Sequence, residues 1–206
     1  MMTGEINGVF PTPVYIARSD SDLTSNEEIQ KIIKEGMVDN DYNLSSENNY
    51  IFDENLKELK QFCEHHIKTY VKEVISPKEE LDFYITQSWL NVTKPGQQHH
   101  QHCHPNSIIS GVFYVSTEED DSITFIDYNW TLKEMIKPEI KEFTQWNSPL
   151  WFFPAIAGEL ILFPSWLQHK VQPNEKATTD RISIAFNTFV RGKLGNNKEL
   201  TELILT

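Results

Sequence analysis

The hydrophobic positions of this chain change their period near residue 81. Upstream of that point they recur every three to four residues. A group of isoleucines follows a Ser25–Glu28 pair that has capping-box spacing, and a second group runs through residues 53–75. We therefore predict two helices in this part, preceded by a first strand at 8–16 that two prolines interrupt.

Downstream of residue 81 the period is two, and β-branched and aromatic residues are frequent. The predicted strands are 82–92, 108–115, 122–127, 158–163, 169–172 and 181–190. Short strands separated by turns are typical of a sandwich or a barrel, and helices that come first can cover one of its faces. The pattern thus predicts a mostly β fold with N-terminal helices packed on one sheet.

The length of 206 residues suits one domain, 1–206. We divide it into a helical support region (1–80), a strand-rich core (81–192) and a C-terminal tail (193–206). Within the core, residues 128–157 form an insert with several aromatic residues and little periodicity. Such an insert is either a binding loop or an aromatic packing element, and the sequence leaves both open.

The net charge of −12 bears on which kinds of molecule this chain can bind. An acidic chain without a basic stripe repels phosphate backbones, which disfavours nucleic acid. No apolar run is long enough to span a membrane, and the N-terminus has neither the basic start nor the apolar stretch of a signal peptide. The two cysteines, Cys63 and Cys103, make no CxxC pair. We therefore expect a cytoplasmic location, where thiols stay reduced.

Four of the seven histidines lie between positions 99 and 104. In an extended strand alternate side chains share a face, so His100, His102 and His104 would point one way. His99 and Cys103 would point the other way. Imidazoles two residues apart can bind one metal ion, and Fe, Zn, Cu and Ni all accept such ligands. The alternative is a polar, solvated loop.

A third metal ligand would have to come from elsewhere, and His169 is the only histidine downstream. It follows a buried strand and a Pro-Ser turn, which can bring it back beside the first pair; the alternative is a packed core histidine. Twelve residues later, Arg181 and Ser183 lie on the more polar face of their strand. A buried guanidinium requires an anion and its planar fork matches a carboxylate, whereas an exposed one would form a surface ion pair.

Taken together, these segments resemble the 2-oxoglutarate/Fe(II)-dependent oxygenases, most closely a group from marine phages and bacteria with prolyl hydroxylase-like relatives. The resemblance covers nearly the whole chain and rests on Phe10–Val14, Ser88–Asn91, His102–Ser107, Ser110–Tyr114, Gly158–Ser165, His169–Pro173, Arg181–Ser183 and Asn187. It implies a double-stranded β-helix (a jelly roll, or cupin-like barrel) with helices packed on one sheet. A phage-encoded member would act in the host cytoplasm, and a homodimer is an open option.

The resemblance also implies roles for individual residues. Fe(II) would be held by His102, His104 and His169, which would form the catalytic centre. The cosubstrate 2-oxoglutarate would be bound by Arg181, Ser183, Tyr114 and Asn91. Of these, Arg181 would pair with the C5 carboxylate. The implied activity is that of a hydroxylase, which consumes O2, decarboxylates 2-oxoglutarate to succinate and CO2, and oxidises a substrate, either a peptide residue or a small molecule.

The third metal position departs from the family pattern, which combines two histidines with an Asp or Glu. Here a neutral histidine, His104, stands in place of the carboxylate, so the site is one unit more positive. Three outcomes are open: His104 is the third ligand, which we favour; Asp127 reaches into the site; or the position is empty.

Two other interpretations compete. A cupin-type metalloenzyme also uses three histidines and needs no 2-oxoglutarate. The spacing from Gly96 to His102 and His104 fits it, but its Glu is missing and Arg181 is unexplained. A non-catalytic jelly-roll module could use a metal as a cross-link between strands, with His100 as a fourth ligand.

Overall fold

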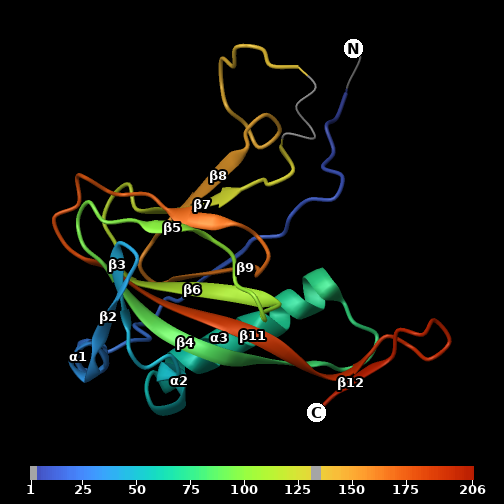
Figure 1. Ribbon diagram of the computed structural model, residues 1–206, viewed down its shortest axis with the longest axis horizontal. Coiled ribbons are helices and arrows are strands. Elements are labelled where there is room, and N and C mark those ends of the chain that lie inside the picture. The colour runs from blue at the N-terminus through green and yellow to red at the C-terminus, as the bar shows by residue number, and fades with distance from the viewer. Residues whose placement is uncertain (1–3, 131–135) are drawn as a thin grey trace.

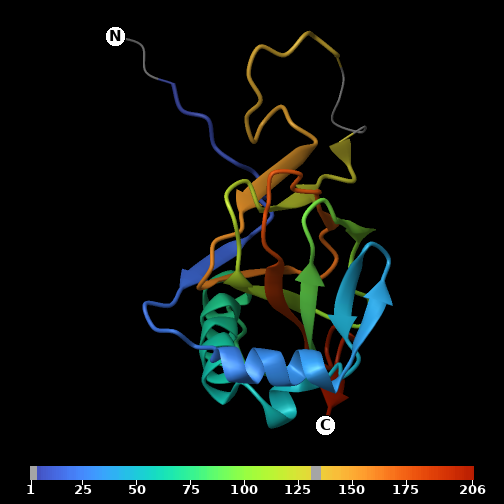
Figure 2. The ribbon, with the colours of Figure 1, turned by 90° about the vertical axis from the view of Figure 1, so that its left-hand side faces the viewer.

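The computed structural model describes residues 4–130 and 136–206. Two antiparallel sheets face each other, and helices cover the outer face of the larger sheet (Figures 1 and 2). This arrangement confirms the predicted mostly β fold with helices on one sheet. Residues 1–3, which we used in the signal-peptide argument, and residues 131–135 of the predicted insert lie outside the described residues.

The larger sheet has the strand order β1-β9-β6-β11-β4-β3-β2, with β12 paired to β11. Its strands are β1 (Tyr15–Arg18), β2 (Met37–Asn40), β3 (Asn43–Ser46), β4 (Asp82–Thr93), β6 (Ile109–Ser116), β9 (Glu159–Pro164), β11 (Arg181–Leu194) and β12 (Leu203–Leu205). The smaller sheet has the order β5-β10-β7-β8. Its strands are β5 (His99–His102), β7 (Ser122–Ile126), β8 (Leu150–Pro154) and β10 (His169–Val171).

The first predicted helix is confirmed as α1 (Asn26–Glu35), which begins with the predicted capping box: Ser25 accepts from the Glu28 N–H. The second predicted helix, 53–75, is wrong as one continuous element. It is divided into α2 (Ile51–Glu54), α3 (Lys57–Tyr70) and the π-helical turn η1 (Val71–Ile75). The break lies at Leu56, whose φ of 58° is left-handed and therefore ends α2 before α3 begins.

The observed strands differ from the predicted ones in several places. The first strand begins at Tyr15 rather than at residue 8, because Pro11 and Pro13 have no N–H to donate to a ladder. The region predicted as helical support also contains the β2–β3 hairpin, which extends the larger sheet. The predicted insert contains β8, and the predicted tail contains β12. The division into three regions of one domain stays a prediction.

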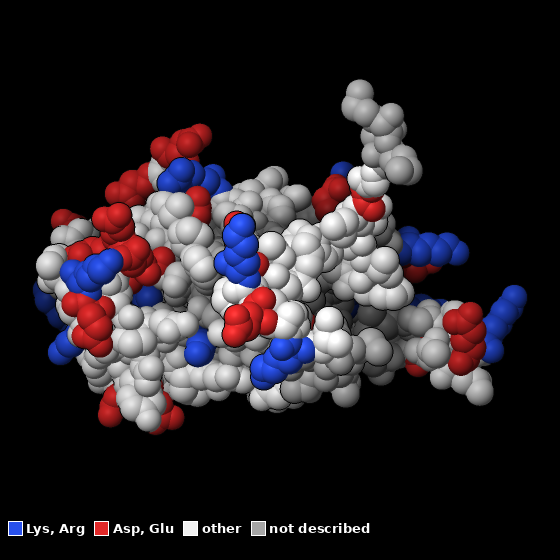
Figure 3. All heavy atoms as spheres, turned by 90° about the horizontal axis from the view of Figure 1, so that it is seen from above, with Lys and Arg blue, Asp and Glu red and all other residues white. Residues whose placement is uncertain are grey.

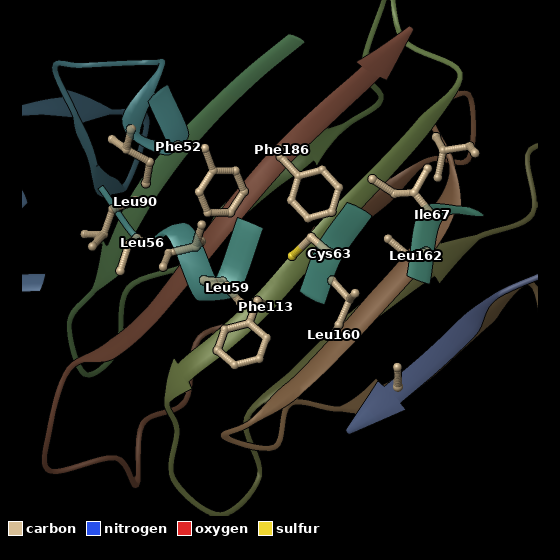
Figure 4. Close-up of a cluster of buried hydrophobic side chains, with 14 of the residues drawn as sticks. Phe52, Leu56, Leu59, Cys63, Ile67, Leu90, Phe113, Leu160, Leu162 and Phe186 are labelled. Atoms are coloured by element: carbon tan, nitrogen blue, oxygen red, sulfur yellow. The ribbon is translucent and has the colours of Figure 1, made fainter. Parts of the chain in front are cut away.

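A hydrophobic core fills the space between the helices and the larger sheet (Figure 4). In this core Leu59, Cys63 and Ile67 of α3 face the sheet, and none of them is exposed to solvent. Gly111 on β6 permits the close approach of Phe186 on β11, because a Cβ at position 111 would overlap the Phe186 ring. This layer holds the larger sheet in place and leaves its other face for the space between the two sheets.

The space between the sheets is divided into two parts. Toward β6, β7 and β9 it is filled by an apolar cluster consisting of Tyr114, Ile123, Phe125, Ala155, Ile161, Phe163 and Leu167. Toward β4, β11, β5 and β10 most of the inward side chains are polar, and the predicted site residues lie in this polar part. Within residues 4–130 and 136–206, no helix has the length and apolar character needed to cross a membrane.

Candidate metal centre

The structure brings His102, His104 and His169 together in the polar part of the space between the two sheets. His102 ends β5 and is directly opposite His169 at the start of β10, and His104 follows two residues after His102. One ligand nitrogen from each of the three side chains lies within 4.8 Å of the other two. His169 is buried, and the other two are half-buried. Three imidazole nitrogens this close can bind a single metal ion.

Hydrogen bonds determine which nitrogen each ring presents. The Nδ1 atom of His102 donates to the backbone oxygen of His100 at 2.8 Å, and that of His169 donates to the backbone oxygen of Leu167 at 2.9 Å. The His104 Nδ1 donates to the side-chain oxygen of Asn187 at 2.6 Å. Because each Nδ1 therefore carries the proton, each Nε2 has a free lone pair.

The buried Nε2 of His104 is the strongest sign that this arrangement fits a metal. It has no hydrogen-bond partner among the residues that the structure describes. A buried polar nitrogen without a partner costs free energy, and a metal ion bound to its lone pair would remove that cost. The donor set of three neutral imidazoles suits Fe(II) and other divalent transition metals.

The same burial keeps the three rings neutral. It lowers the pKa of His102 to about 4, and it lowers the pKa of His169 well below its usual range. Burial also lowers the pKa of His104, although the hydrogen bond to Asn187 opposes this effect. Neutral imidazole is the form that binds a metal, so the rings need not lose protons near pH 7.

The prediction of one extended strand through the histidine cluster is wrong at both ends. His104 lies beyond the end of β5. At the other end, β5 pairs His102 with His169 but His99 with Val171, so β5 has one more residue than β10 between these two pairs. This β-bulge places the His99 ring against the His102 ring, with centroids 4.4 Å apart, rather than on the opposite face.

The predicted cosubstrate residues form a wall across three neighbouring strands. Ser183 of β11 is directly opposite Asn91 of β4 on one side and Tyr114 of β6 on the other. Arg181 lies two residues earlier on the same face of β11. All four side chains are buried, and the Asn91 Oδ1 has no hydrogen-bond partner within the described part of the chain. The structure thus brings together all four of the residues that the resemblance implied.

Arg181 already has an anionic neighbour that the sequence did not indicate. Its terminal nitrogen Nη1 lies 3.5 Å from the Asp121 Oδ1, and the two side chains are only 6% and 4% exposed. Asp121 is held in turn by the Glu118 N–H at 2.9 Å and by the Asn174 amide at 3.2 Å. The predicted alternative of a surface ion pair is therefore wrong, because this pair is buried. Asp121 stands in an acidic turn, where nothing in the sequence distinguishes it from its neighbours.

Asn187 is a second residue whose role the sequence did not reveal. Its side-chain oxygen accepts from the His104 ring and also from the Ser110 hydroxyl, at 2.9 Å. Ser110 continues into a chain of hydroxyl groups through Ser165 to Ser107. Asn187 lies on the same face of β11 as Arg181, so one strand contacts both the histidines and the wall of predicted cosubstrate residues. The alternation of polar residues in this strand was the signal that could have found it.

The structure also bears on the other ligands that we considered. The Asp127 carboxylate accepts the Asn129 N–H at 3.0 Å, and among the described residues it does not belong to either group of converging ligand atoms. His100 converges with His99 and His102 rather than with the inner three. Of the three outcomes for the third position, the geometry therefore favours His104.

A comparison with protein families identifies the chain. Residues 87–187, which contain the three histidines and the wall of predicted cosubstrate residues, match the family described as "Putative 2OG-Fe(II) oxygenase". This match places residues 87–187 among the 2-oxoglutarate/Fe(II)-dependent oxygenases. The oxygenase therefore uses Fe(II), 2-oxoglutarate and O2. No curated protein matches its sequence.

Solved structures of the same fold cover most of the oxygenase. The carbocyclase SnoK from nogalamycin biosynthesis, which depends on α-ketoglutarate, superimposes with a TM-score of 0.60 at 12% identity, over 86% of this chain and 79% of its own. A Pseudomonas putida prolyl-4-hydroxylase gives 0.53 at 12% identity, over 88% and 94%. The viral collagen prolyl hydroxylase of Paramecium Bursaria Chlorella virus-1, a 2-oxoglutarate complex, gives 0.52 at 13% identity, over 85% and 94%. At these identities the likeness shows the fold, a double-stranded β-helix.

Proposed function

We propose that this oxygenase is a hydroxylase that holds Fe(II) on His102, His104 and His169 and binds 2-oxoglutarate through Arg181. The observation that carries the proposal is the convergence of one ligand nitrogen from each of these three histidines. Each ring keeps a free lone pair on Nε2, because its Nδ1 donates a hydrogen bond. When bound, Fe(II) and 2-oxoglutarate supply the activation of O2, with 2-oxoglutarate decarboxylated to succinate and CO2. The side chains described here bind and orient these groups.

The inner face of β11 orients the cosubstrate. Arg181 lies at one end of this face, and Asn187, which contacts the metal-side His104, lies at the other. A carboxylate of 2-oxoglutarate at Arg181 would meet the hydroxyl groups of Ser183 and Tyr114, since both lie in the next row of the sheet. The other end of 2-oxoglutarate would then point toward the histidines.

Asp121 leaves Arg181 able to bind this carboxylate. The ion pair between them has a nitrogen–oxygen distance of 3.5 Å and is not a hydrogen bond. The planar guanidinium can therefore donate its hydrogen bonds to a second carboxylate while Asp121 offsets part of its charge. A buried, charged pair of this kind also holds the Arg181 side chain in one orientation.

One observation supports hydroxylation of a peptide residue over the other substrate classes. The predicted insert carries exposed aromatic residues, Trp146, Trp151 and Phe152, which suit contact with a substrate more than internal packing. Nucleic acid is disfavoured by the charge of −12, and the face seen in Figure 3 mixes acidic and basic residues without a continuous basic field.

The first test is anaerobic titration of 2-oxoglutarate into the Fe(II)-loaded protein, followed by visible absorbance. We expect a metal-to-ligand charge-transfer band, because 2-oxoglutarate that chelates Fe(II) absorbs in this way. Arg181→Ala should bind Fe(II) but require far more 2-oxoglutarate to develop the band. Arg191→Ala is the matched control, since Arg191 lies on the same strand but is exposed and stacks on Tyr84. A normal titration in Arg181→Ala would contradict the assignment of this arginine.

The hydroxylase outcome requires a second readout. A proline-rich peptide incubated with the loaded enzyme and labelled O2 should gain one labelled oxygen atom, detected by mass spectrometry, together with an equal amount of succinate. Succinate release with a product that contains no added oxygen would indicate a ring closure or an epimerisation instead.

A further inference from the structure

We propose that His99, His100 and His102 form a second, outer metal site that takes Zn(II), Ni(II), Cu(II) or a similar divalent transition ion. This proposal rests on the proposed function, because the outer site shares His102 with the proposed Fe(II) site. One ligand nitrogen from each of these three side chains lies within 4.8 Å of the other two, the same criterion that the inner three satisfy.

The β-bulge in β5 creates this second group. Without it, His99 would face away from His102; with it, the two rings stack with centroids 4.4 Å apart. The His100 ring completes the group, with its centroid 5.0 Å from that of His99 and 5.1 Å from that of His102. The bulge therefore turns an alternating strand into a convergent cluster.

A separate observation also points to a ligand. The Nδ1 of His100 is buried and has no hydrogen-bond partner in the described residues. A buried ring nitrogen without a partner is costly unless something binds it. In the inner group the equivalent signal is the unpartnered Nε2 of His104. Each three-histidine group therefore contains one nitrogen that lacks a partner among the residues that the structure describes.

The two sites exclude each other. The Nδ1 of His102 donates to the His100 backbone oxygen at 2.8 Å, so its ring has a single lone pair, on Nε2. That lone pair can bind an inner or an outer ion, but not both. An ion in the outer site thus withdraws a ligand from the proposed Fe(II) site, leaving His104 and His169 alone.

The chemistry of the outer group determines which ions would use it. Three neutral imidazoles bind Ni(II), Cu(II) and Zn(II) more strongly than Fe(II). We therefore infer that an excess of these ions inhibits the oxygenase by removing His102 from the inner site. This differs from simple replacement of Fe(II), because the inhibiting ion is held by His99 and His100.

The test uses His169→Ala, which removes an inner ligand and leaves the outer group complete. Calorimetric titration with Zn(II) should show one equivalent bound, and electron paramagnetic resonance of the Cu(II) form should show three imidazole nitrogens. The double variant His100→Ala/His169→Ala is the matched control. This double variant retains the backbone oxygen at position 100, so His102 keeps its hydrogen bond. Because the His100 ring is missing, we expect Zn(II) binding to be lost. His104→Ala, which spares the outer group in the same way, replaces His169→Ala if that variant does not fold.

The results separate this proposal from the proposed function. If the wild-type protein gives the charge-transfer band with Fe(II) and 2-oxoglutarate but folded His169→Ala and His104→Ala bind no Zn(II), the outer site is overturned and the proposed function stands. Equal Zn(II) binding by His169→Ala and the double variant would also overturn it, since the ion would then be held elsewhere. Zn(II) binding that needs His100, in a protein that gives no band, would support the outer site and contradict the proposed function.

Discussion

The two faces of the neighbouring strands β4 and β11 differ sharply in character, although both belong to the same two strands. On the outward face, Leu90, Ile184 and Phe186 are fully buried against the helices. Their immediate neighbours in the sequence point inward, and the polar Asn91, Ser183 and Asn187 are among them. The period of two therefore separates a stabilising face from the face of the proposed ligand-binding residues along one pair of strands.

The two faces differ in whether their buried side chains find suitable partners among the described residues. The outward Leu90, Ile184 and Phe186 lie in the hydrophobic core, so burying them stabilises the fold. On the inward side, the Asn91 Oδ1 and the His104 Nε2 are buried without partners in the residues described. Such groups lower the stability of the free protein, and a metal and a cosubstrate would satisfy them. Substitutions on the two faces should therefore have opposite consequences.

The largest effect on stability is expected for the outward residue Phe186. Phe186→Ala should lower the free energy of unfolding by about 3–5 kcal/mol, because it leaves a cavity against Phe52 and Gly111. Denaturant unfolding of the metal-free protein measures this change. Phe152→Ala is the control, since its ring is 63% exposed and its loss should change stability by less than about 0.5 kcal/mol. Similar losses in both variants would refute the assignment of Phe186 to the stabilising core.

The next effect is expected one residue along the strand, at the inward Asn187. We interpret it as a positioning residue, because its oxygen fixes the proton on the His104 Nδ1. Asn187→Ala should weaken metal binding by about 10–100-fold, as is typical when a ligand loses its outer hydrogen bond. Titration with Co(II), followed by its visible absorbance, measures the affinity.

Rescue distinguishes positioning from a general structural role. Asn187→Asp retains an oxygen that can accept from His104, so most of the metal affinity should return. Unfolding of both variants in the absence of metal checks that the fold is intact. Metal affinity that follows stability alone, or that is unchanged in Asn187→Ala, would contradict the assignment.

The face assignments could be predicted from the sequence because alternation is local. In the strand at 181–190 one face is more polar than the other, and the structure places Arg181 and Ser183 on the inner face as expected. The histidine pair at positions 102 and 169 was equally predictable, since a turn between two strands brings their ends together. The family resemblance then added the roles of these residues, which alternation alone does not supply.

What the sequence could not predict depends on register and on tertiary contacts. The bulge that turns His99 toward His102 inserts one residue, and no local signal in a run of polar histidines marks where it falls. The β2–β3 hairpin is short and largely polar, so it lacks the pattern of a buried strand. Asp121 becomes the partner of Arg181 only when β7 and β11 are brought together.

The smallest effect is expected at Asn91, whose neighbour Leu90 provides the matched control on the other face. Asn91→Ala should leave the free energy of unfolding unchanged or raise it slightly, because it removes a buried oxygen that has no partner among the described residues. The same variant should weaken 2-oxoglutarate binding by roughly 1 kcal/mol, the contribution of one hydrogen bond, in the anaerobic titration. Leu90→Ala should instead cost about 2–5 kcal/mol of stability. Should Asn91→Ala destabilise the protein as much as Leu90→Ala and leave cosubstrate affinity untouched, Asn91 would belong to the core rather than to the site.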